Sequence, residues 1–176
     1  MKIAVYLGSR NGARPEYVQA ARSLGAWIGD KGHTLVYGGS RGGLMGELAS
    51  AVLNHGGKVT GVLPDVDEIM NLRQKGLTEY IYTKDVAERR SKMIELADAF
   101  AVLPGGLGTL DEITEVLSLK SLNLIPQPIV FFDAADYFAP LRALFRHMIG
   151  EGFSEEAYFE NVLFTDDTTQ LDAFLR

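Results

Sequence analysis

Residues 88–115 read ERRSKMIELADAFAVLPGGLGTLDEITE, and this stretch decides the fold. A charged segment with helical spacing precedes a short apolar run at Phe100–Leu103. The run leads directly into Pro104–Thr109, which contains three glycines, and a second helical pattern follows. A continuous apolar run of this length is typical of a strand that is covered on both faces of a parallel sheet. The stretch therefore predicts an α/β unit in which a glycine loop connects a buried strand to a helix.

The same alternation continues on both sides of this stretch. The other predicted strands are Ile3–Leu7, Thr34–Tyr37, Val59–Leu63, Glu79–Tyr82 and Ile129–Phe132. The predicted helices are Tyr17–Asp30, Gly43–Asn54, Val86–Ala97, Thr109–Leu122 and Tyr137–Ile149. This order predicts a Rossmann-like, doubly wound, mainly parallel sheet with helices on both faces, in a single domain of residues 1–176. The polar segment Asp65–Gly76 is predicted to be a mobile loop or a short helix. The tail after Gly152 is predicted to form a surface strand and a last helix.

Two more glycine-rich turns follow predicted strands, at Gly8–Gly12 and Gly38–Gly43. In open α/β sheets, ligands bind outside the carboxyl ends of the strands. Glycine lets the backbone approach a phosphate, and a helix N-terminus offers unpaired N–H groups to an anion. The three glycine turns together predict one shared anion-binding crevice.

Composition excludes several classes of protein. The net charge of −6 argues against a nucleic-acid groove, which needs a broad basic face. No apolar stretch approaches the roughly 20 residues that span a bilayer, and the N-terminus is predicted to be a strand and not a secretory signal. We therefore expect a soluble, cytoplasmic protein without membrane or nucleic-acid partners. The chain has no cysteine, and His33, His55 and His147 lack ligand spacing, so no metal site is expected.

Common nucleotide-cofactor motifs are also missing. The first turn reads GSRNGA at 8–13, which lacks the G-x-G-x-x-G pattern of dinucleotide-binding proteins. The second predicted strand ends at Tyr37 without the carboxylate that would hold a cofactor ribose, and neither later glycine loop ends in Gly-Lys-Ser/Thr. We expect no cofactor.

Two long motifs resemble the LONELY GUY family of cytokinin-activating phosphoribohydrolases, often labelled "lysine decarboxylase-like". The pattern P-G-G-x-G-T-x-x-E is matched at Pro104–Glu112, and VYGGSRGGLMGE stands at Val36–Glu47. The R-K-x-x-M element appears at Arg89–Met93 with arginine in place of lysine. The resemblance, which runs to about Phe153, implies a Rossmann-like homodimer with its active site near the interface. It also implies hydrolysis of nucleoside 5′-monophosphates, AMP or cytokinin ribotides, to base and ribose 5-phosphate.

Residue roles follow from this resemblance position by position. It implies a catalytic pair, Arg89 and Glu112. It implies substrate binding at Arg90, at Gly106 to Thr109 (including Gly108), at Glu68 and at Ser118. Further binding candidates from the glycine turns and neighbouring helices are Ser9, Gly39, Ser40, Gly43, Met45, Met93 and Gly105. Turn formation or capping by the serines, and core packing by the methionines, are alternatives. Ser40 replaces a common glycine and Val86-Ala87 a common Met-His, which bears on base specificity.

The catalytic pair suits the chemistry. Hydrolysis of an N-glycosidic bond passes through an oxocarbenium-like sugar, which a carboxylate can stabilise while orienting water. We expect Glu112 on the first helical turn, where the dipole favours its charged form. Arg89 offers a planar fork of donors to phosphate, ribose or the leaving base. The alternative for Glu112 is a T-x-x-E capping box with Thr109.

Other classes stay open at this point. The same crevice would suit a non-catalytic nucleotide sensor or carrier. A true lysine decarboxylase would need pyridoxal phosphate on a lysine, for which Lys92 is the one near a motif. A homodimer is further favoured by apolar positions on the helix after the glycine loop, namely Ile113, Val116 and Leu117.

Overall fold

The computed structural model describes residues 1–175, apart from the side chain of Glu68. Its strands are β1 (Lys2–Tyr6), β2 (Thr34–Tyr37), β3 (Lys58–Pro64), β4 (Glu79–Thr83), β5 (Ala99–Val102), β6 (Ile129–Phe132) and β7 (Val162–Thr165). Its helices are α1 (Pro15–Asp30), α2 (Gly43–Asn54), α3 (Asp67–Met70), α4 (Val86–Leu96), α5 (Leu107–Ser121), α6 (Ala139–Gly150) and α7 (Thr168–Phe174). Two 3-10 turns are η1 (Ala134–Asp136) and η2 (Glu156–Phe159).

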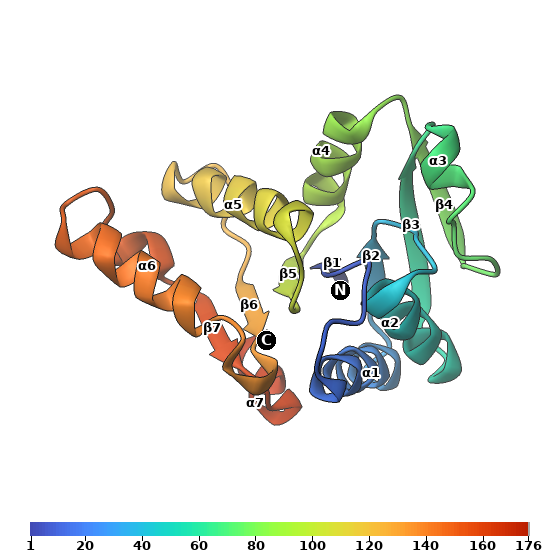
Figure 1. Cartoon of the computed structure of the whole chain (residues 1–176), viewed down its shortest axis with the longest axis horizontal. Coiled ribbons are helices and arrows are strands. Elements are labelled where there is room, and N and C mark those ends of the chain that lie inside the picture. Colours follow the sequence, from blue (N-terminus) through green and yellow to red (C-terminus); the bar gives the residue numbers. More distant parts are fainter. Residues whose placement is uncertain (176) are drawn as a thin grey trace.

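The strands form one sheet in the order β4-β3-β2-β1-β5-β6-β7, and all neighbouring pairs are parallel. The predicted doubly wound α/β fold is confirmed. From β1 the chain moves outward through β2, β3 and β4, and then returns to the other side of β1 with β5 (Figure 1). Ile3 of β1 pairs with Leu35 of β2 on one side and with Ala99 of β5 on the other. This reversal of strand order is the place where open α/β sheets bind ligands.

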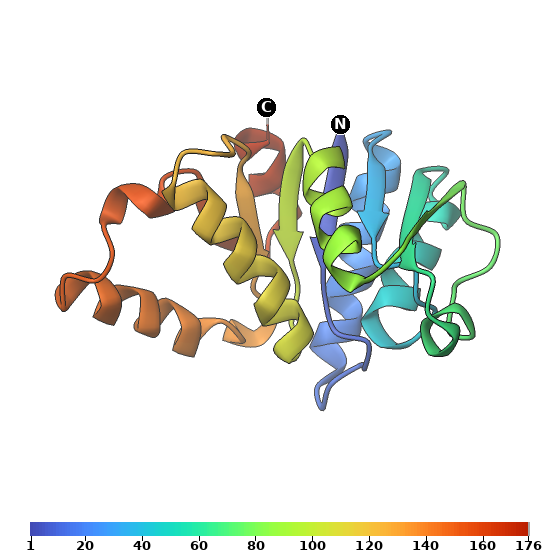
Figure 2. The same ribbon diagram turned by 90° about the horizontal axis from the view of Figure 1, so that it is seen from above.

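Alternate residues of each strand face opposite layers of helices, as the pleat requires. Ile3 and Val5 pack into a core with residues of α1, α2 and α7. Ala4 and Tyr6 pack into a second core with residues of α4, α5 and α6. Figures 1 and 2 show the two layers of helices on opposite faces of the twisted sheet. The five inner strands, β1, β2, β3, β5 and β6, are almost fully buried and largely apolar, which is why short apolar runs predicted them well.

The helix after the glycine loop starts earlier than predicted. α5 begins at Leu107, because the extended backbone of Gly106 serves as its N-cap without a side-chain hydrogen bond. Thr109 is therefore the third residue of α5, and Glu112 lies on the second turn and not the first. The capping box of Thr109 and Glu112 is thus wrong, since a cap at Thr109 would require the helix to start after it.

Two further segments differ from or refine the prediction. The helix expected from Tyr137 begins at Ala139, because the preceding residues form η1, whose exit is held by a hydrogen bond from Phe138 N–H to Asp133 Oδ1 (2.8 Å). The ambiguous segment Asp65–Gly76 contains the short helix α3. The tail forms β7 and α7, as expected.

Across residues 1–175, none of the helices combines the length and apolar character needed to cross a membrane. A cytoplasmic location stays a prediction.

Candidate functional site

The three glycine turns meet at the carboxyl edge of the sheet. The N–H of Gly8, after β1, donates to the carbonyl oxygen of Pro104, after β5, at 3.0 Å. Gly43 has a φ of +56°, and a Cβ there would lie 2.3 Å from the backbone nitrogen of Arg10. Only glycine fits this contact between the second turn and the first. The shared crevice predicted from the glycines therefore has a structural basis in direct contacts between their turns.

A cavity of about 530 Å³ opens between these turns, within the usual range of small-molecule sites. Its polar and charged lining side chains come from the first turn, α1, α4, α5 and the segment after η1. They are Ser9, Arg10, Asn11, Tyr17, Arg89, Thr109, Glu112 and Tyr137. Its glycines are Gly8, Gly12, Gly38, Gly105, Gly106 and Gly108, and Met45 adds an apolar side chain. The cavity thus coincides with the reversal of strand order between β1 and β5.

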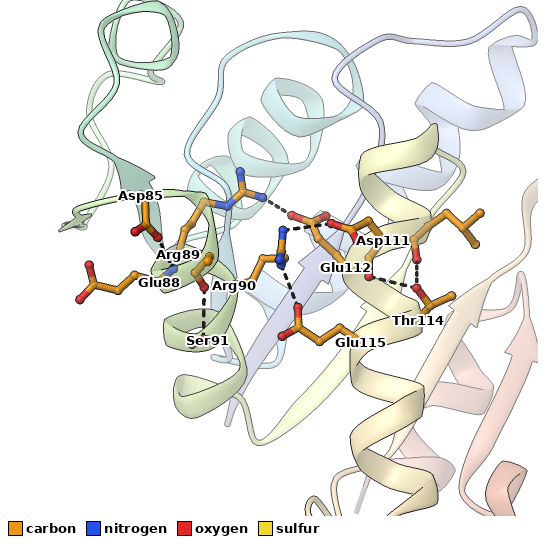
Figure 3. A network of polar contacts seen from close by, with 11 residues as sticks. Asp85, Glu88, Arg89, Arg90, Ser91, Asp111, Glu112, Thr114 and Glu115 are labelled. Atoms are coloured by element: carbon orange, nitrogen blue, oxygen red, sulfur yellow. Dashed lines mark hydrogen bonds and ion pairs between the residues drawn. The ribbon is translucent and has the colours of Figure 1, made fainter.

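Arg89 and Glu112 form an ion pair inside this cavity. Nη2 of Arg89, on α4, donates to Oε1 of Glu112, on α5 (Figure 3). The two side chains are only 16% and 11% exposed. Gly38, which follows β2, lies against the pair: a Cβ there would be in ordinary contact, at 3.4 Å, with Cζ and Nη2 of Arg89, and only 2.8 Å from Cε of Met45. Residues 23 positions apart in the sequence are therefore brought together as a charged pair in a largely buried place.

Burial is the largest influence on the acidity of Glu112. Loss of solvation raises the pKa of its carboxyl group, and the positive charge and hydrogen bond of Arg89 oppose that shift. The expected place of Glu112 on the first helical turn was wrong, since it lies one turn further along α5. That Glu112 stays ionised remains a prediction, and its ion pair with Arg89 supports it. A carboxyl group whose pKa is raised in this way is a better proton acceptor when ionised, which suits activation of water.

Arg90 points to α5 and does not line the cavity. Its Nε donates to Oε2 of Glu115 at 2.8 Å, and its Nη1 donates to Oδ2 of Asp111 at 3.0 Å (Figure 3). Asp111 and Glu115 are four residues apart and so lie on the same face of the helix. Arg90 therefore fastens α4 to α5 beside the Arg89–Glu112 pair.

The start of α5 leaves space at two of its glycines. A Cβ at Gly106 or Gly108 would meet nothing within 4 Å, whereas one at Gly105 would lie 2.1 Å from Oγ1 of Thr109. Among the described residues, the hydrogen-bond ladder of α5 starts with Leu110 N–H on the carbonyl oxygen of Gly106 (3.0 Å). The preceding N–H groups are the unpaired donors of a helix N-terminus, next to open space in the cavity.

Some predicted binding residues lie outside the cavity lining. Ser40 accepts a hydrogen bond from Gly42 N–H at 3.1 Å, and Gly39, with a φ of +74°, turns the chain against Leu63. Met93 is fully buried in the second core, which agrees with the packing alternative. Ser118 lies on α5 beyond the cavity. The Glu68 side chain lies outside the described residues.

Sequence reasoning missed several lining residues. Arg10, Asn11 and Gly12 lie in the Gly8–Gly12 turn, which was expected to help form the crevice, but only Ser9 of that turn was singled out as a binding residue. Tyr137 was assigned to a helix, so its role in the cavity had no signal in the sequence. Lys92 pairs with Glu95 at 2.8 Å, and none of the cavity residues within 1–175 is a lysine. The described part of the chain contains no group of three His, Cys, Asp or Glu side chains placed to hold a metal ion.

The chain is similar to known proteins along most of its length. Residues 45–173 match a family model described as "Possible lysine decarboxylase". The chain is 38% identical to a cytokinin riboside 5′-monophosphate phosphoribohydrolase of Rhodococcoides fascians, covering 99% of this chain and 88% of that one. It is 33% identical to the protein of the same name in Mycobacterium marinum, covering 94% of this chain and 88% of that one.

Two solved structures with the same fold are more distant in sequence than these relatives. The molybdenum cofactor binding protein of Rippkaea orientalis superposes with a TM-score of 0.76 at 20% identity, covering 99% of this chain and 94% of that one. The molybdenum cofactor carrier protein of Chlamydomonas reinhardtii gives 0.73 at 21% identity, with coverage of 99% and 97%. At this identity the likeness concerns the fold alone. The sequence matches confirm the resemblance of the motifs: the chain belongs to the cytokinin riboside 5′-monophosphate phosphoribohydrolase family, within the group described as possible lysine decarboxylases.

Proposed function

We propose that the protein hydrolyses the N-glycosidic bond of a nucleoside 5′-monophosphate, AMP or a cytokinin ribotide, to the free base and ribose 5-phosphate. The observation that carries the proposal is the buried Arg89–Glu112 pair inside a cavity whose rim is the N-terminus of α5. A carboxylate and an anion-binding helix end in one cavity suit a substrate with a phosphate at one end and a reacting sugar at the other. The names of the relatives support the same reaction.

The phosphate binds at the start of α5 in this proposal. Gly106 and Gly108 leave open space for close approach, and the helix dipole favours an anion there. Thr109 lines the same part of the cavity and adds a hydroxyl donor. Ser9 and Met45 line the cavity as binding candidates on other elements.

Glu112 and Arg89 act on the sugar and the leaving base. As the N-glycosidic bond breaks, its electron pair goes to the base and positive charge develops on the ribose, which the Glu112 carboxylate stabilises. A water molecule attacks C1′ and gives one proton to Glu112. The departing base takes up a proton from solvent water, and Glu112 then returns its proton to solvent, so the carboxylate is restored. Arg89 holds the carboxylate in place and presents its remaining donors to the substrate.

We also propose that the protein is a homodimer through the faces of α5 and α6. A groove lined by Leu110, Leu141 and Leu144, with the buried Ile113 at its base, separates these helices. Leu110 and Leu144 are 42% and 46% exposed, and Leu107, beside the cavity, is 85% exposed. Apolar surface of this extent marks an interaction site, and a second copy is the partner that the family resemblance implies. Ile113 and Val116, expected to serve the dimer, are instead buried in the chain's own core.

The deciding experiment measures release of free base from AMP and from an N6-prenylated riboside monophosphate, with adenosine as the control. We expect both monophosphates to be hydrolysed and adenosine to be hydrolysed far more slowly, because it lacks the anion. Equal rates for AMP and adenosine would remove the phosphate from the mechanism. Tight binding of AMP without base release would favour a non-catalytic carrier instead.

A further inference from the structure

We infer that Tyr137 is a positioning residue for substrate phosphate: its hydroxyl fixes the Gly105–Gly106 peptide so that the Gly106 N–H faces the cavity. The inference rests on the proposed binding of phosphate at the start of α5. Tyr137 comes from the segment after β6, far from the motifs that carry the family resemblance. It acts through the backbone of the glycine loop and needs no contact with the substrate.

Two carbonyl groups of the glycine loop are held by hydrogen bonds from outside it. The hydroxyl of Tyr137 donates to the carbonyl oxygen of Gly105. The N–H of Gly8 donates to the carbonyl oxygen of Pro104 at 3.0 Å. These bonds come from two different elements and act on consecutive peptide groups. They restrain a stretch that, as Gly-Gly, has little conformational preference of its own.

Holding a carbonyl also sets the direction of an N–H group. A trans peptide is planar, and its C=O and N–H point to opposite sides. Fixing the Gly105 oxygen on Tyr137 therefore turns the N–H of Gly106 to the opposite side. Gly106 is the N-cap of α5 and lines the cavity, so its peptide group belongs to the donors available to an anion. Without the phenol, this peptide loses the hydrogen bond that fixes its carbonyl oxygen.

Tyr137 is itself held firmly. Ala135 and Asp136 precede it with φ values of 53° and 55°, a left-handed conformation that costs energy in residues other than glycine. Arg142 stabilises this turn, because its guanidinium forms ion pairs with Asp136 and, at 3.5 Å, with Asp133. The tyrosine ring packs edge-to-face on Tyr17 at 5.6 Å between centroids. A strained turn kept in place by charges and ring contacts is typical of a functional constraint.

The phenol oxygen is the group to remove. Tyr137→Phe keeps the ring and its packing on Tyr17 and deletes only the donor to Gly105. We expect the KM for AMP to rise about 3- to 10-fold, the effect of one hydrogen bond, with kcat changed less than 2-fold. The activity on adenosine, which has no phosphate, should stay at the wild-type level. The preference for AMP over adenosine should therefore fall by the same 3- to 10-fold.

The matched control is Tyr158→Phe, which removes a tyrosine hydroxyl that donates to Glu155 on the protein surface at 3.1 Å. It should leave the preference unchanged. The inference would be overturned if Tyr137→Phe lowered kcat alone, if it affected AMP and adenosine equally, or if Tyr158→Phe had the same effect. A melting temperature within a few degrees of wild type is expected for both variants, because neither change creates a cavity.

A second measurement separates this inference from the proposed reaction. Thermal protection of the protein by ribose 5-phosphate and by inorganic phosphate reports anion binding without turnover. We expect Tyr137→Phe to need about 3- to 10-fold more ribose 5-phosphate for the same protection. If wild type does not release base from AMP, the proposed reaction fails, yet a shifted protection curve would still support the role of Tyr137. An unshifted curve would refute it.

Discussion

Nε of Arg90 lies 2.8 Å from Oε2 of Glu115, and this ion pair joins α4 to α5 one residue away from Arg89. The guanidinium also contacts Asp111, one turn earlier on α5. Neighbouring arginines on one helix thus have different partners. Arg89 faces Glu112 inside the cavity, and Arg90 holds the outer side of the same helix pair (Figure 3).

Substitution of each arginine by lysine separates these positions. Arg89→Lys should lower turnover on the order of 10²-fold, because an ammonium cannot reproduce the planar fork in a largely buried site. Arg90→Lys should change turnover only a few-fold, since a lysine still pairs with one carboxylate at a half-exposed place. Base release from AMP by both variants measures the difference. Equal losses would mean that Arg90 also contacts the substrate.

Glu112→Gln tests the carboxylate. We expect turnover to fall on the order of 10²–10⁴-fold, the range for a positioned acid–base group. The amide keeps the size of the side chain and can still accept a hydrogen bond from Arg89, so the fold should survive. AMP should still bind, because the start of α5 is unchanged. A folded variant with near wild-type base release would contradict the assignment and make Asp111 the next carboxylate to test.

The pH dependence follows from the same residue. Because burial raises the pKa of Glu112, kcat should begin to fall, as pH decreases, above the ordinary glutamate range near 4.3. The effect of pH on stability has the opposite sign, because the folded state holds the Glu112 proton more tightly than the unfolded state does. The contribution of Glu112 to stability therefore decreases as pH rises through the interval between the two pKa values. Both effects should disappear in Glu112→Gln, as measured by pH–rate profiles and by denaturation at several pH values.

Gly106→Val tests close approach at the helix N-terminus. A Cβ at Gly106 meets no atom within 4 Å, so the protein should fold, but the side chain should keep a phosphate away from the backbone. We expect the KM for AMP to rise at least 10-fold, or about 1.4 kcal/mol of binding. Gly150→Val, at an equally open position on α6, is the control and should leave KM unchanged. A similar KM for both variants would place the phosphate elsewhere.

The proposed dimer makes a prediction about Leu144. Light scattering or sedimentation at assay concentration should give twice the chain mass of 19.3 kDa. Leu144→Asp places a charge on the apolar groove between α5 and α6 and should shift the protein toward monomers. A fully active wild-type monomer would refute the dimer. A dimer unaffected by the change would place its interface on another face.

Local pattern was sufficient for most of the fold. The five inner strands are buried, so they appeared mostly as apolar runs, whereas the edge strands β4 and β7 are partly exposed. The glycine turns after the strands indicated the edge of the sheet that holds the cavity. The proposed catalytic pair, Arg89 and Glu112, was selected through motifs. Its ion pair was not predicted, because the sequence does not tell how α4 and α5 cross. The start of α5 was misplaced by two residues, since Thr109 resembles a cap while the true cap is Gly106.

Tyr137 shows what the sequence leaves out. Its position depends on left-handed residues at Ala135 and Asp136, which no turn rule predicts for Ala-Asp. Arg90 is the opposite case. The R-K-x-x-M motif indicated that Arg90 binds substrate, whereas in the structure Arg90 forms ion pairs with two carboxylates on α5, those of Asp111 and Glu115.

The contact of Gly43 with Arg10 limits how the protein could change its substrate. No side chain fits between the two turns at that point, so neither turn can gain bulk or shift without displacing the other. Changes of base preference should therefore come from cavity side chains that are not part of the Gly43–Arg10 contact, such as Asn11, Tyr17 and Met45. Libraries that randomise whole turns should yield mostly misfolded protein, and libraries confined to these three positions should stay folded.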